Sequence, residues 1–331
     1  MIVLGIESSC DETAAALVRD GREVLASVVA SQEAVHHRYG GVVPELASRT
    51  HMEVITPVVV EALNRSGLGL AAVDAVAATQ GPGLVGSLLV GFSFAKALAF
   101  GRGLPCVGVN HLEAHVHALY LAPAPPPFPF VCLLASGGHT GLYHVSSSSS
   151  MELMGQTRDD AAGEAFDKVA KMLGLGYPGG AVIERLAREG DPERIRFPRP
   201  YLENESFDFS FSGIKTAVCR YLNEHRSAPG WRAADVAAGF QEAVVEVLVR
   251  KLVRAAKARR TARVALVGGV AANRFLREHL AAATGREGLQ AYVPAAELCG
   301  DNAAMVAAAG YHRLVAGLRC GLDADVFSRS Q

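Results

Sequence analysis

The chain has 331 residues, of which 50% are hydrophobic, and its formal net charge is -1. Because single hydrophobic cores stop growing at about 250–300 residues, this length predicts two cores, and the composition argues against disorder. A protein that grips nucleic acid by itself usually carries a strong basic excess. Any nucleic-acid contact of this chain therefore rests on a local patch or on partner subunits.

Cysteine usage and hydropathy indicate a reducing compartment. The six cysteines form no CxxC pair, and most lie in apolar stretches. Glu7 and Asp11 interrupt the apolar start, which excludes a signal-peptide pattern there. The longest apolar stretch, residues 84–100, contains Lys96 and two serines, so we interpret it as a buried helix and not as a membrane span. We expect a cytoplasmic protein.

The first 110 residues predict alternating strands and helices. We expect strands over residues 2–6, 13–18, 24–31, 73–78 and 105–109, and helices over residues 43–64 and 84–100. The stretch APAPPPFPF over residues 122–130 is typical of a linker, because proline fixes φ and lacks an N–H donor.

The opening pattern recurs after this linker. We predict strands over residues 130–135 and 140–145, a polar loop over residues 146–150, and a strand over 263–267 followed by a helix that starts near Ala271. Residues 301–316 predict a helix with Asp301 at its N-cap. The repeat indicates two similar lobes with a cleft between them. The expected division is an N-terminal lobe over 1–125, a C-terminal lobe over 126–298, and a segment over 299–331 that packs back on the N-terminal lobe.

His111 and His115 are four residues apart, so on a helix they share one face and can bind one metal ion. A zinc peptidase of the HExxH type needs glutamate directly after the first histidine, where this chain has Leu112. Glu113 lies about 200° around the helix from His111, so it cannot act as the general base beside the metal. Asp301 is the best third-ligand candidate, although its spacing alone favours a plain N-cap aspartate.

Two glycine-rich turns follow strands, at residues 134–140 and 267–273, and such turns bring backbone N–H groups close to phosphate. They predict a nucleotide-like ligand, without the GxGxxG or GxxxxGK[ST] pattern. Acidic residues lie at Asp11 and Glu12 and over residues 159–167, the latter shortly before a Tyr-Pro-Gly-Gly turn that could help to hold a ribose. The basic residues between 251 and 263 predict a solvated helix end, with RNA contact as the alternative.

Seven long motifs, in order, resemble the bacterial TsaD family of tRNA adenosine threonylcarbamoyltransferases, formerly called glycoproteases or O-sialoglycoprotein endopeptidases. They are GIESSCDET from Gly5, NHLEAH from Asn110, ASGGHT from Ala135, GEAFDKVAKMLGLGYPGG from Gly163, FSFSGIKTA from Phe209, GGVAANRFLR from Gly268 and CGDNAAM from Cys299. The resemblance implies an α/β fold with two ribonuclease-H-like lobes of the actin, heat-shock ATPase and sugar-kinase (ASKHA) architecture and an interlobe cleft.

The resemblance also implies site residues. One divalent metal per subunit, Fe²⁺ with Zn²⁺ or Mn²⁺ as alternatives, is expected on His111, His115 and Asp301, which overturns the N-cap interpretation of Asp301. The expected substrate-binding residues include two departures from relatives, Ala135 in place of valine and Glu184 in place of the aspartate of some members. The full set is Leu134, Ala135, Ser136, Gly137, Gly138, Asp167, Gly180, Glu184 and Asn273.

The implied reaction moves threonylcarbamoyl from threonylcarbamoyl-AMP to the exocyclic amine of the adenosine 3′ of the anticodon, in tRNAs reading codons that begin with A. We hypothesise that the metal polarises the donor and that Asp11, with Glu12, orients or deprotonates the amine. The implied partners are tRNA, a paralogous TsaB-type subunit, a small TsaE-type ATPase and the donor synthase. A metallopeptidase, an ATP-binding regulatory protein and a small-molecule carbamoyltransferase are the alternatives.

Overall fold

The structure, a computed structural model, describes residues 1–200 and 205–329 and divides the chain into two compact units. Unit 1 consists of Met1–Pro125 and Glu297–Gln331, and unit 2 of Pro126–Ala296. Unit 1 therefore takes its residues from both ends of the chain. The boundary near Pro125 falls inside the proline-rich stretch.

Unit 1 contains a mixed sheet with the strand order β3-β2-β1-β4-β5. Strand β1 pairs with β2 in antiparallel fashion and with β4 in parallel fashion, and β4 pairs with β5 in parallel fashion. The bounds are β1 Ile2–Glu7, β2 Glu12–Arg19, β3 Glu23–Ser31, β4 Ala75–Gly81 and β5 Cys106–Asn110. A short helix α1, Glu33–His36, follows β3.

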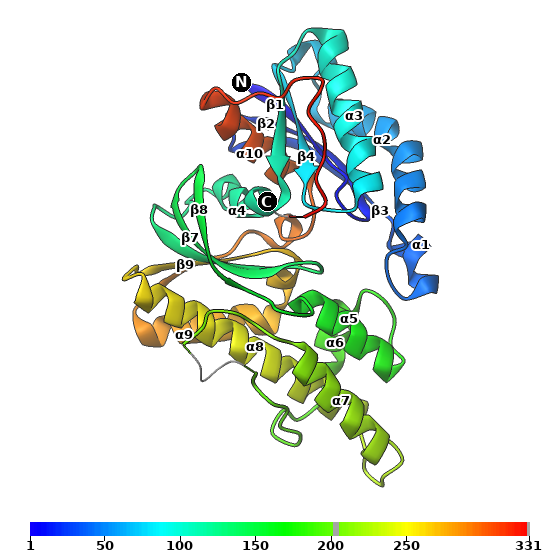
Figure 1. Cartoon of the computed structure of the whole chain (residues 1–331), viewed down its shortest axis with the longest axis vertical. Helices are drawn as coiled ribbons and strands as arrows, with labels where there is room; N and C mark the ends of the chain where they lie inside the picture. Colours follow the sequence, from blue (N-terminus) through cyan, green and yellow to red (C-terminus); the bar gives the residue numbers. More distant parts are fainter. Residues whose placement is uncertain (201–204, 330–331) are drawn as a thin grey trace. The chain divides into compact units, whose positions relative to one another are not determined.

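Two helix layers cover the two faces of this sheet (Figure 1). Helices α2, Pro44–Ser66, and α3, Val85–Arg102, pack on the face that carries Leu4, Ile6 and Leu17. Helices α4, His111–His117, and α10, Ala303–Val315, pack on the face that carries Val3, Ala16 and Val18. This alternation follows from the two-residue period of a strand that is buried on both faces.

Helix α10 approaches the sheet closely because small residues line that face. A Cβ atom placed on Gly5 of β1 would lie 2.2 Å from the carbonyl oxygen of Ala303, and one placed on Gly310 would lie 2.3 Å from the Cβ of Ala77. Both distances are below any real Cβ contact, so only glycine fits at these two positions. The close approach brings the first turn of α10 next to the ends of the central strands.

Unit 2 repeats the topology of unit 1. Its sheet has the order β10-β9-β6-β7-β8, which read from the other end matches the arrangement of β3-β2-β1-β4-β5. As in unit 1, the first strand, β6, pairs antiparallel with β7 and parallel with the later strand β9. The bounds are β6 Phe130–Ala135, β7 Thr140–Ser147, β8 Ser150–Gln156, β9 Arg263–Val267 and β10 Gln290–Tyr292.

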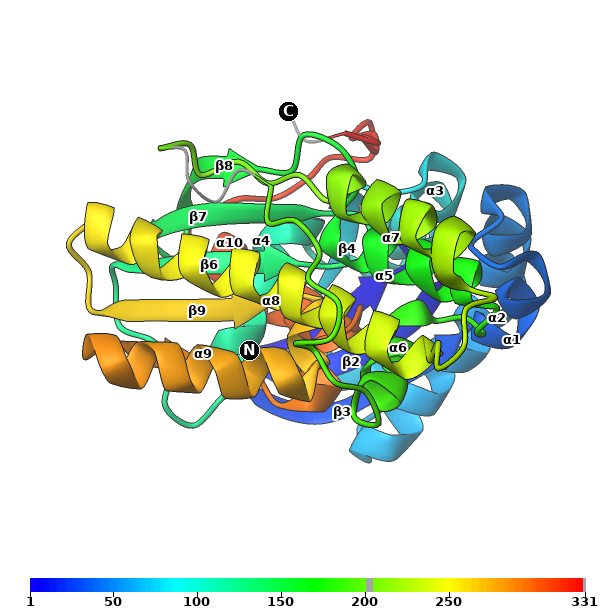
Figure 2. The ribbon, with the colours of Figure 1, turned by 90° about the horizontal axis from the view of Figure 1, so that it is seen from below.

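The helices in the described part of unit 2 are α5 Ala162–Leu173, α6 Gly179–Ala187, α7 Ser212–His225, α8 Ala233–Ala258 and α9 Arg274–Glu287. Helix α8 packs against β6 and β9, with α9 beside it (Figure 2). Short 3-10 turns lie at His37–Tyr39, Leu70–Ala72, Ala118–Leu121, Gly269–Ala272 and Ala296–Leu298.

Three local predictions were wrong. Residues 146–150 are not a loop, because β7 continues to Ser147 and β8 begins at Ser150, so the serine run forms the tip of a hairpin. The N-cap of α10 is Asn302, whose side chain accepts a hydrogen bond from the Met305 N–H at 2.9 Å, and not Asp301. The helix after β9 begins only at Arg274, since a 3-10 turn occupies the residues before it.

The predicted solvated helix end is confirmed in part: Lys257, Arg259 and Arg260 are exposed, whereas Lys251 is not. Lys251 is fully buried and donates to the carbonyl oxygens of Ser206 and Asp208. Lys257 pairs with Glu287 at 2.6 Å. Arg263 donates to three carbonyl oxygens of the proline-rich stretch. Lys251, Lys257 and Arg263 thus take part in contacts within unit 2, and RNA contact at this helix end stays a prediction.

Among the described residues, α3 is the one helix whose length and composition would allow it to cross a membrane. It packs against β4 and α2 and contributes Phe92, Ala95 and Ala99 to the core of unit 1. A core helix can pass the same test, so α3 is weak evidence for a span.

Asp159, which follows β8, holds the FSFSG motif of residues 209–213 in place through hydrogen bonds. Its carboxylate accepts hydrogen bonds from Ser210 Oγ at 2.5 Å, Ser212 Oγ at 2.6 Å and the backbone N–H groups of Phe211 and Ser212 at 2.8 and 3.1 Å. Burial raises the pKa of Asp159, but these donors outweigh burial and lower the pKa below its usual value.

We expect Asp159→Asn to lower the free energy of unfolding by about 1–3 kcal/mol at pH 7. A lowered folded-state pKa stabilises above the unfolded pKa of about 3.9 and is lost as the pH falls through the folded pKa. The difference from wild type should therefore shrink at pH 3. Urea unfolding at both pH values measures it, with the exposed Asp323→Asn as control. An equal difference at both pH values would contradict the charge-based explanation.

Candidate metal centre and substrate loops

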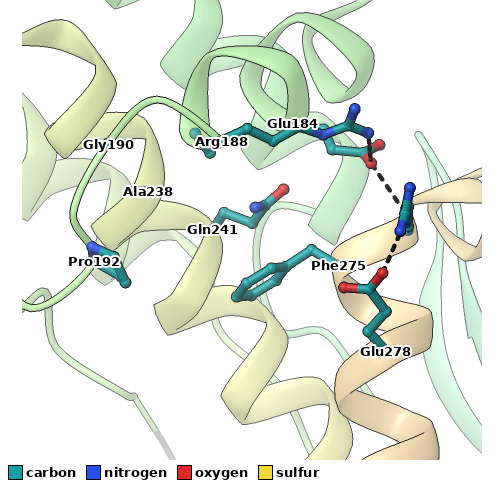
Figure 3. A pocket seen from close by; sticks show the side chains of 10 residues that line it. Glu184, Arg188, Gly190, Pro192, Ala238, Gln241, Phe275 and Glu278 are labelled. Carbon is teal, nitrogen blue, oxygen red and sulfur yellow. Dashed lines mark hydrogen bonds and ion pairs between the residues drawn. The ribbon is translucent and has the colours of Figure 1, made fainter.

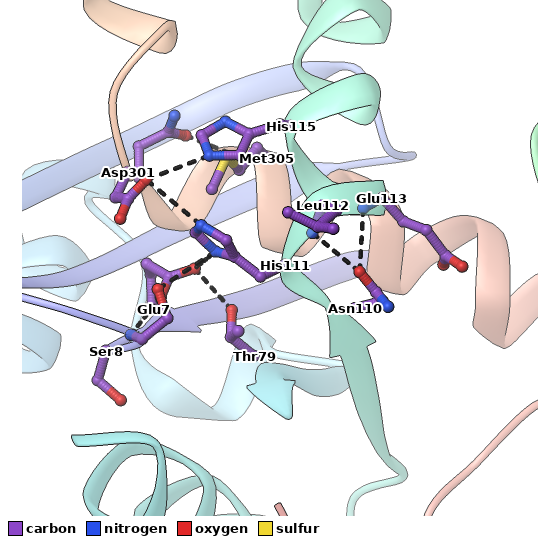
Figure 4. Close-up of polar contacts among 12 residues, drawn as sticks. Glu7, Ser8, Thr79, Asn110, His111, Leu112, Glu113, His115, Asp301 and Met305 are labelled. Carbon is purple, nitrogen blue, oxygen red and sulfur yellow. Dashed lines mark hydrogen bonds and ion pairs between the residues drawn. The ribbon is translucent and has the colours of Figure 1, made fainter. Parts of the chain in front are cut away.

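The way in which helix α4 begins sets the direction of His111 and His115. Strand β5 ends at Asn110, whose side-chain oxygen accepts from the N–H groups of Leu112 and Glu113 at 2.9 and 3.3 Å. This cap starts the helix at His111, so His111 and His115 lie on one helical face. Their ring centroids are 4.7 Å apart, and the rings meet at 76° (Figure 4).

Asp301 completes a group of three potential ligands in unit 1. It directly precedes the Asn302 cap of α10, and its Oδ1 lies 3.2 Å from His115 Nε2 and 3.6 Å from His111 Nε2. One ligand atom from each of the three residues lies within 4.8 Å of the others. The structure thus brings together His111, His115 and Asp301, which are far apart in the chain.

The residues fit a divalent metal. Both imidazoles are buried, and the two ring nitrogens of His115 make no hydrogen bond to the part of the chain that the structure describes. Asp301 Oδ1 faces His115 Nε2 at 3.2 Å without a hydrogen bond, and a metal ion would satisfy this buried nitrogen. Two imidazoles and one carboxylate suit iron, zinc or manganese and leave coordination positions open for a substrate.

Glu113 points away from this group, as the helical spacing predicts. Its Oε2 lies 3.2 Å from Arg313 Nη1 on α10, and Figure 4 shows it on the far side of α4 from Asp301. The general base of an HExxH peptidase is therefore missing beside the histidines.

The charges around His111 favour a cation. Burial lowers the pKa of His111, but the carboxylates of Asp301 and Glu7 outweigh burial and raise the pKa to about 9. Glu7, at the end of β1, is completely buried. Sequence reasoning missed Glu7, although a charged residue that ends an otherwise apolar strand is a usable signal.

Asp11 and Glu12 lie where β2 begins, in the same unit as the potential metal ligands. Asp11 is buried, with 8% of its surface exposed. Burial and the charges of Asp11 and Asp301 raise the pKa of Glu12 to about 9, and the two neighbouring carboxyl groups share a hydrogen bond. These surroundings favour the protonated form of Glu12.

In unit 2, the two predicted glycine turns lie against each other. Gly268 has a φ of +92°, and a Cβ atom on it would lie 2.4 Å from the carbonyl oxygen of Ala135. Two hydrogen bonds between Ser136 and His139 close the first turn: the Ser136 N–H donates to the His139 carbonyl, and the Ser136 hydroxyl oxygen accepts from the His139 N–H. The Ser136 carbonyl accepts from the Gly163 N–H at 3.1 Å. Leu134 to Gly138 thus form a tight backbone turn beside the first turn of α5.

The other predicted substrate residues also lie in unit 2. Asp167 Oδ1 accepts from the Gly179 N–H at 2.7 Å, which places the Asp167 carboxylate at the turn that contains Gly180. Glu184 Oε1 accepts from the Arg274 N–H at 3.2 Å, directly after Asn273. These contacts put four predicted residues on α5, α6 and the start of α9.

A pocket of about 410 Å³ opens between α6, α8 and α9 (Figure 3). Its lining includes Glu184, Arg188, Gln241 and Phe275. Asn273 caps α9 by accepting from the Leu276 N–H at 2.9 Å and donates to Gln241 Oε1 at 2.9 Å. Gln241 escaped sequence reasoning because its role depends on a contact between α8 and the start of α9.

A family model described as TsaD, tRNA N6-adenosine threonylcarbamoyltransferase, matches residues 23–308. The chain belongs to this family. Proteins of the same name from Desulforapulum autotrophicum and Symbiobacterium thermophilum are 58% and 56% identical to it, covering 100% and 97% of this chain and 99% and 94% of their own lengths. These matches confirm the resemblance found in the motifs.

Solved structures outside the TsaD family share the fold. HypF from T. kodakarensis aligns with a TM-score of 0.64 at 14% identity, covering 96% of this chain and 48% of HypF. Component A of the (R)-2-hydroxyglutaryl-CoA dehydratase of Acidaminococcus fermentans aligns with a TM-score of 0.57 at 16% identity, covering 95% and 99%. Together with the two five-stranded sheets, these likenesses confirm the predicted α/β class of ASKHA type.

Proposed function

We propose that this chain transfers the threonylcarbamoyl group from threonylcarbamoyl-AMP to the exocyclic amine of the adenosine 3′ of the anticodon, in tRNAs reading codons that begin with A. The observation that carries this proposal is the match to tRNA N6-adenosine threonylcarbamoyltransferases along the whole chain, at up to 58% identity. The chain is then an acyltransferase that modifies tRNA.

The proposed metal site consists of His111, His115 and Asp301 and holds one divalent ion, which we propose is Fe²⁺. When bound, this ion supplies Lewis-acid polarisation of the donor. The support is the spacing of the three ligand atoms, within 4.8 Å of one another, and the lack of hydrogen bonds on His115.

The acidic pair of unit 1 supplies the proposed acid–base chemistry. An exocyclic amine is a weak nucleophile, so its attack needs positioning and a proton acceptor. Because burial and the neighbouring carboxylates favour the protonated form of Glu12, Asp11 is the acceptor that we propose for the amine proton. Glu12 then orients Asp11 through their shared hydrogen bond.

We propose that unit 2 holds the AMP part of the donor. The backbone N–H groups of the turn from Leu134 to Gly138 suit phosphate oxygens. Asp167 and Glu184 offer carboxylates for ribose hydroxyls, beside Gly180 and Asn273. In this proposal the departures at Ala135 and Glu184 have little effect, because the turn binds through its backbone and glutamate keeps the carboxylate.

Binding of the proposed tRNA substrate requires partner proteins in this proposal. With a net charge of -1 and the helix-end cations of α8 engaged within unit 2, we propose that tRNA binding depends on other subunits. A TsaB-type paralogue and a TsaE-type ATPase are the proposed partners, and a threonylcarbamoyl-AMP synthase supplies the donor. The cytoplasm is the proposed compartment.

A reconstituted reaction tests the function. The chain, both partner proteins, the donor synthase with its substrates and unmodified tRNA are incubated together, and the nucleosides are then analysed by mass spectrometry. We expect threonylcarbamoyladenosine in the digest. ATP turnover with unmodified tRNA would instead support a regulatory ATPase, EDTA-sensitive cleavage of a glycoprotein would support a peptidase, and a carbamoylated small molecule would support the third alternative.

A further inference from the structure

The two ring nitrogens of His111 face two different carboxylates. Nε2 lies 3.6 Å from Asp301 Oδ1, on the side of the other potential ligands. Nδ1 lies 3.2 Å from Oε2 of Glu7, on the opposite side of the ring, and the Ser9 hydroxyl oxygen lies 3.2 Å from the same nitrogen (Figure 4). His115 has no matching carboxylate, since its Nδ1 makes no hydrogen bond to any described residue.

Glu7 is held in place by donors from two further segments. Its Oε1 accepts from the Ser9 N–H at 2.5 Å, and its Oε2 accepts from the Thr79 hydroxyl at 2.6 Å. The side chain has no exposed surface. A carboxylate that accepts from two fixed donors has only acceptor capacity left for His111. His111 Nδ1 is therefore the donor in the contact with Glu7.

We propose that Glu7 is a positioning residue that holds the proton of His111 on Nδ1 and so reserves the Nε2 lone pair for a metal ion. This inference rests on the proposed metal centre and deepens it. A carboxylate behind a metal-binding imidazole fixes the tautomer and the ring orientation and makes the ligand nitrogen more basic. Thr79 and Ser9, in turn, fix Glu7.

Glu7→Gln is the informative substitution. Glutamine has the same shape, but its amide offers one oxygen where the carboxylate has two, so Ser9, Thr79 and His111 cannot all keep an acceptor. If the NH₂ group faces His111, that residue must carry its proton on Nε2, where it blocks metal binding. We expect the affinity for zinc, measured by competition with a chelator, to fall by about 10–100-fold.

Nitrogen and proton NMR of the zinc-loaded protein supplies a readout that a merely structural role would not move. We expect wild type to show a downfield Nδ1–H proton of His111, correlated with a zinc-bound Nε2, and Glu7→Gln to lose or shift it. Asp235→Asn, a buried carboxylate of α8 in unit 2 that binds Arg194 at 3.0 Å, is the matched control and should keep both zinc affinity and the resonance.

The outcomes separate the inference from the metal centre. Unchanged affinity and an unchanged resonance in folded Glu7→Gln overturn the inference and leave the metal centre standing. Failure of wild type to bind zinc or Fe²⁺ overturns the metal centre itself. If Glu7→Gln does not fold, Thr79→Val removes one donor to Glu7 and should still shift the Nδ1–H resonance, and an unshifted resonance there overturns the inference.

Discussion

Replacing both His111 and His115 by alanine is expected to remove metal binding and transfer together. The double variant leaves Asp301 as the one remaining residue of the three-residue group, and a single carboxylate does not hold a transition metal at a cellular concentration. Loss of Lewis-acid polarisation costs several kcal/mol in the transition state, so transfer should fall by about 10³-fold or more. Elemental analysis and nucleoside mass spectrometry measure the two effects.

His117→Ala is the matched control for this variant. His117 is also buried on α4, but its Nδ1 contacts the Glu113 carbonyl at 2.8 Å and its ring packs near Tyr120, away from Asp301. We expect this control to keep its metal and its transfer activity. Transfer at the wild-type rate by a metal-free double variant would show that the metal has no part in the reaction.

Asp11→Asn is expected to lower the single-turnover rate of transfer by about 10²–10⁴-fold, the range for losing a general base. Glu12→Gln should lower it by less than about tenfold, because burial and the neighbouring carboxylates keep Glu12 protonated and glutamine resembles the neutral acid. Both variants should retain metal.

Which of the two variants loses more transfer activity tests the roles proposed for Asp11 and Glu12. The assay uses preformed threonylcarbamoyl-AMP and saturating tRNA, so that chemistry limits the rate. A larger loss in Glu12→Gln than in Asp11→Asn would exchange the roles of the two carboxyl groups. Equal metal content in both variants is the condition for this comparison.

Most of the strands can be predicted from the sequence. Continuous apolar runs mark β1, β2 and β6, because these strands are buried on both faces of their sheets. β8 was missed because it is a polar edge strand that begins inside a serine run, and edge strands carry little hydrophobic signal.

The candidate metal site could also be predicted only in part from the sequence. The spacing of His111 and His115 is local and visible in the chain, whereas the packing of α10 beside α4 is what brings Asp301 close to them. From spacing alone it looked like a helix cap, a role that Asn302 takes. Lys251 was misjudged as solvated for a similar reason: the carbonyl groups that bind it come from a distant loop. Tertiary contacts, which no local pattern reveals, decide such roles.

The division of unit 1 between the two ends of the chain has a consequence for synthesis on the ribosome. When the first 125 residues emerge, α4 can cover only its own part of the sheet face that it shares with α10, and all of unit 2 must be translated before α10 appears. At about 5–20 residues per second this delay lasts roughly ten to thirty seconds. A nascent chain in that interval exposes an apolar, alanine-rich sheet surface, which is a natural target for chaperones, and Asp301 of the proposed metal site emerges only near the end of translation.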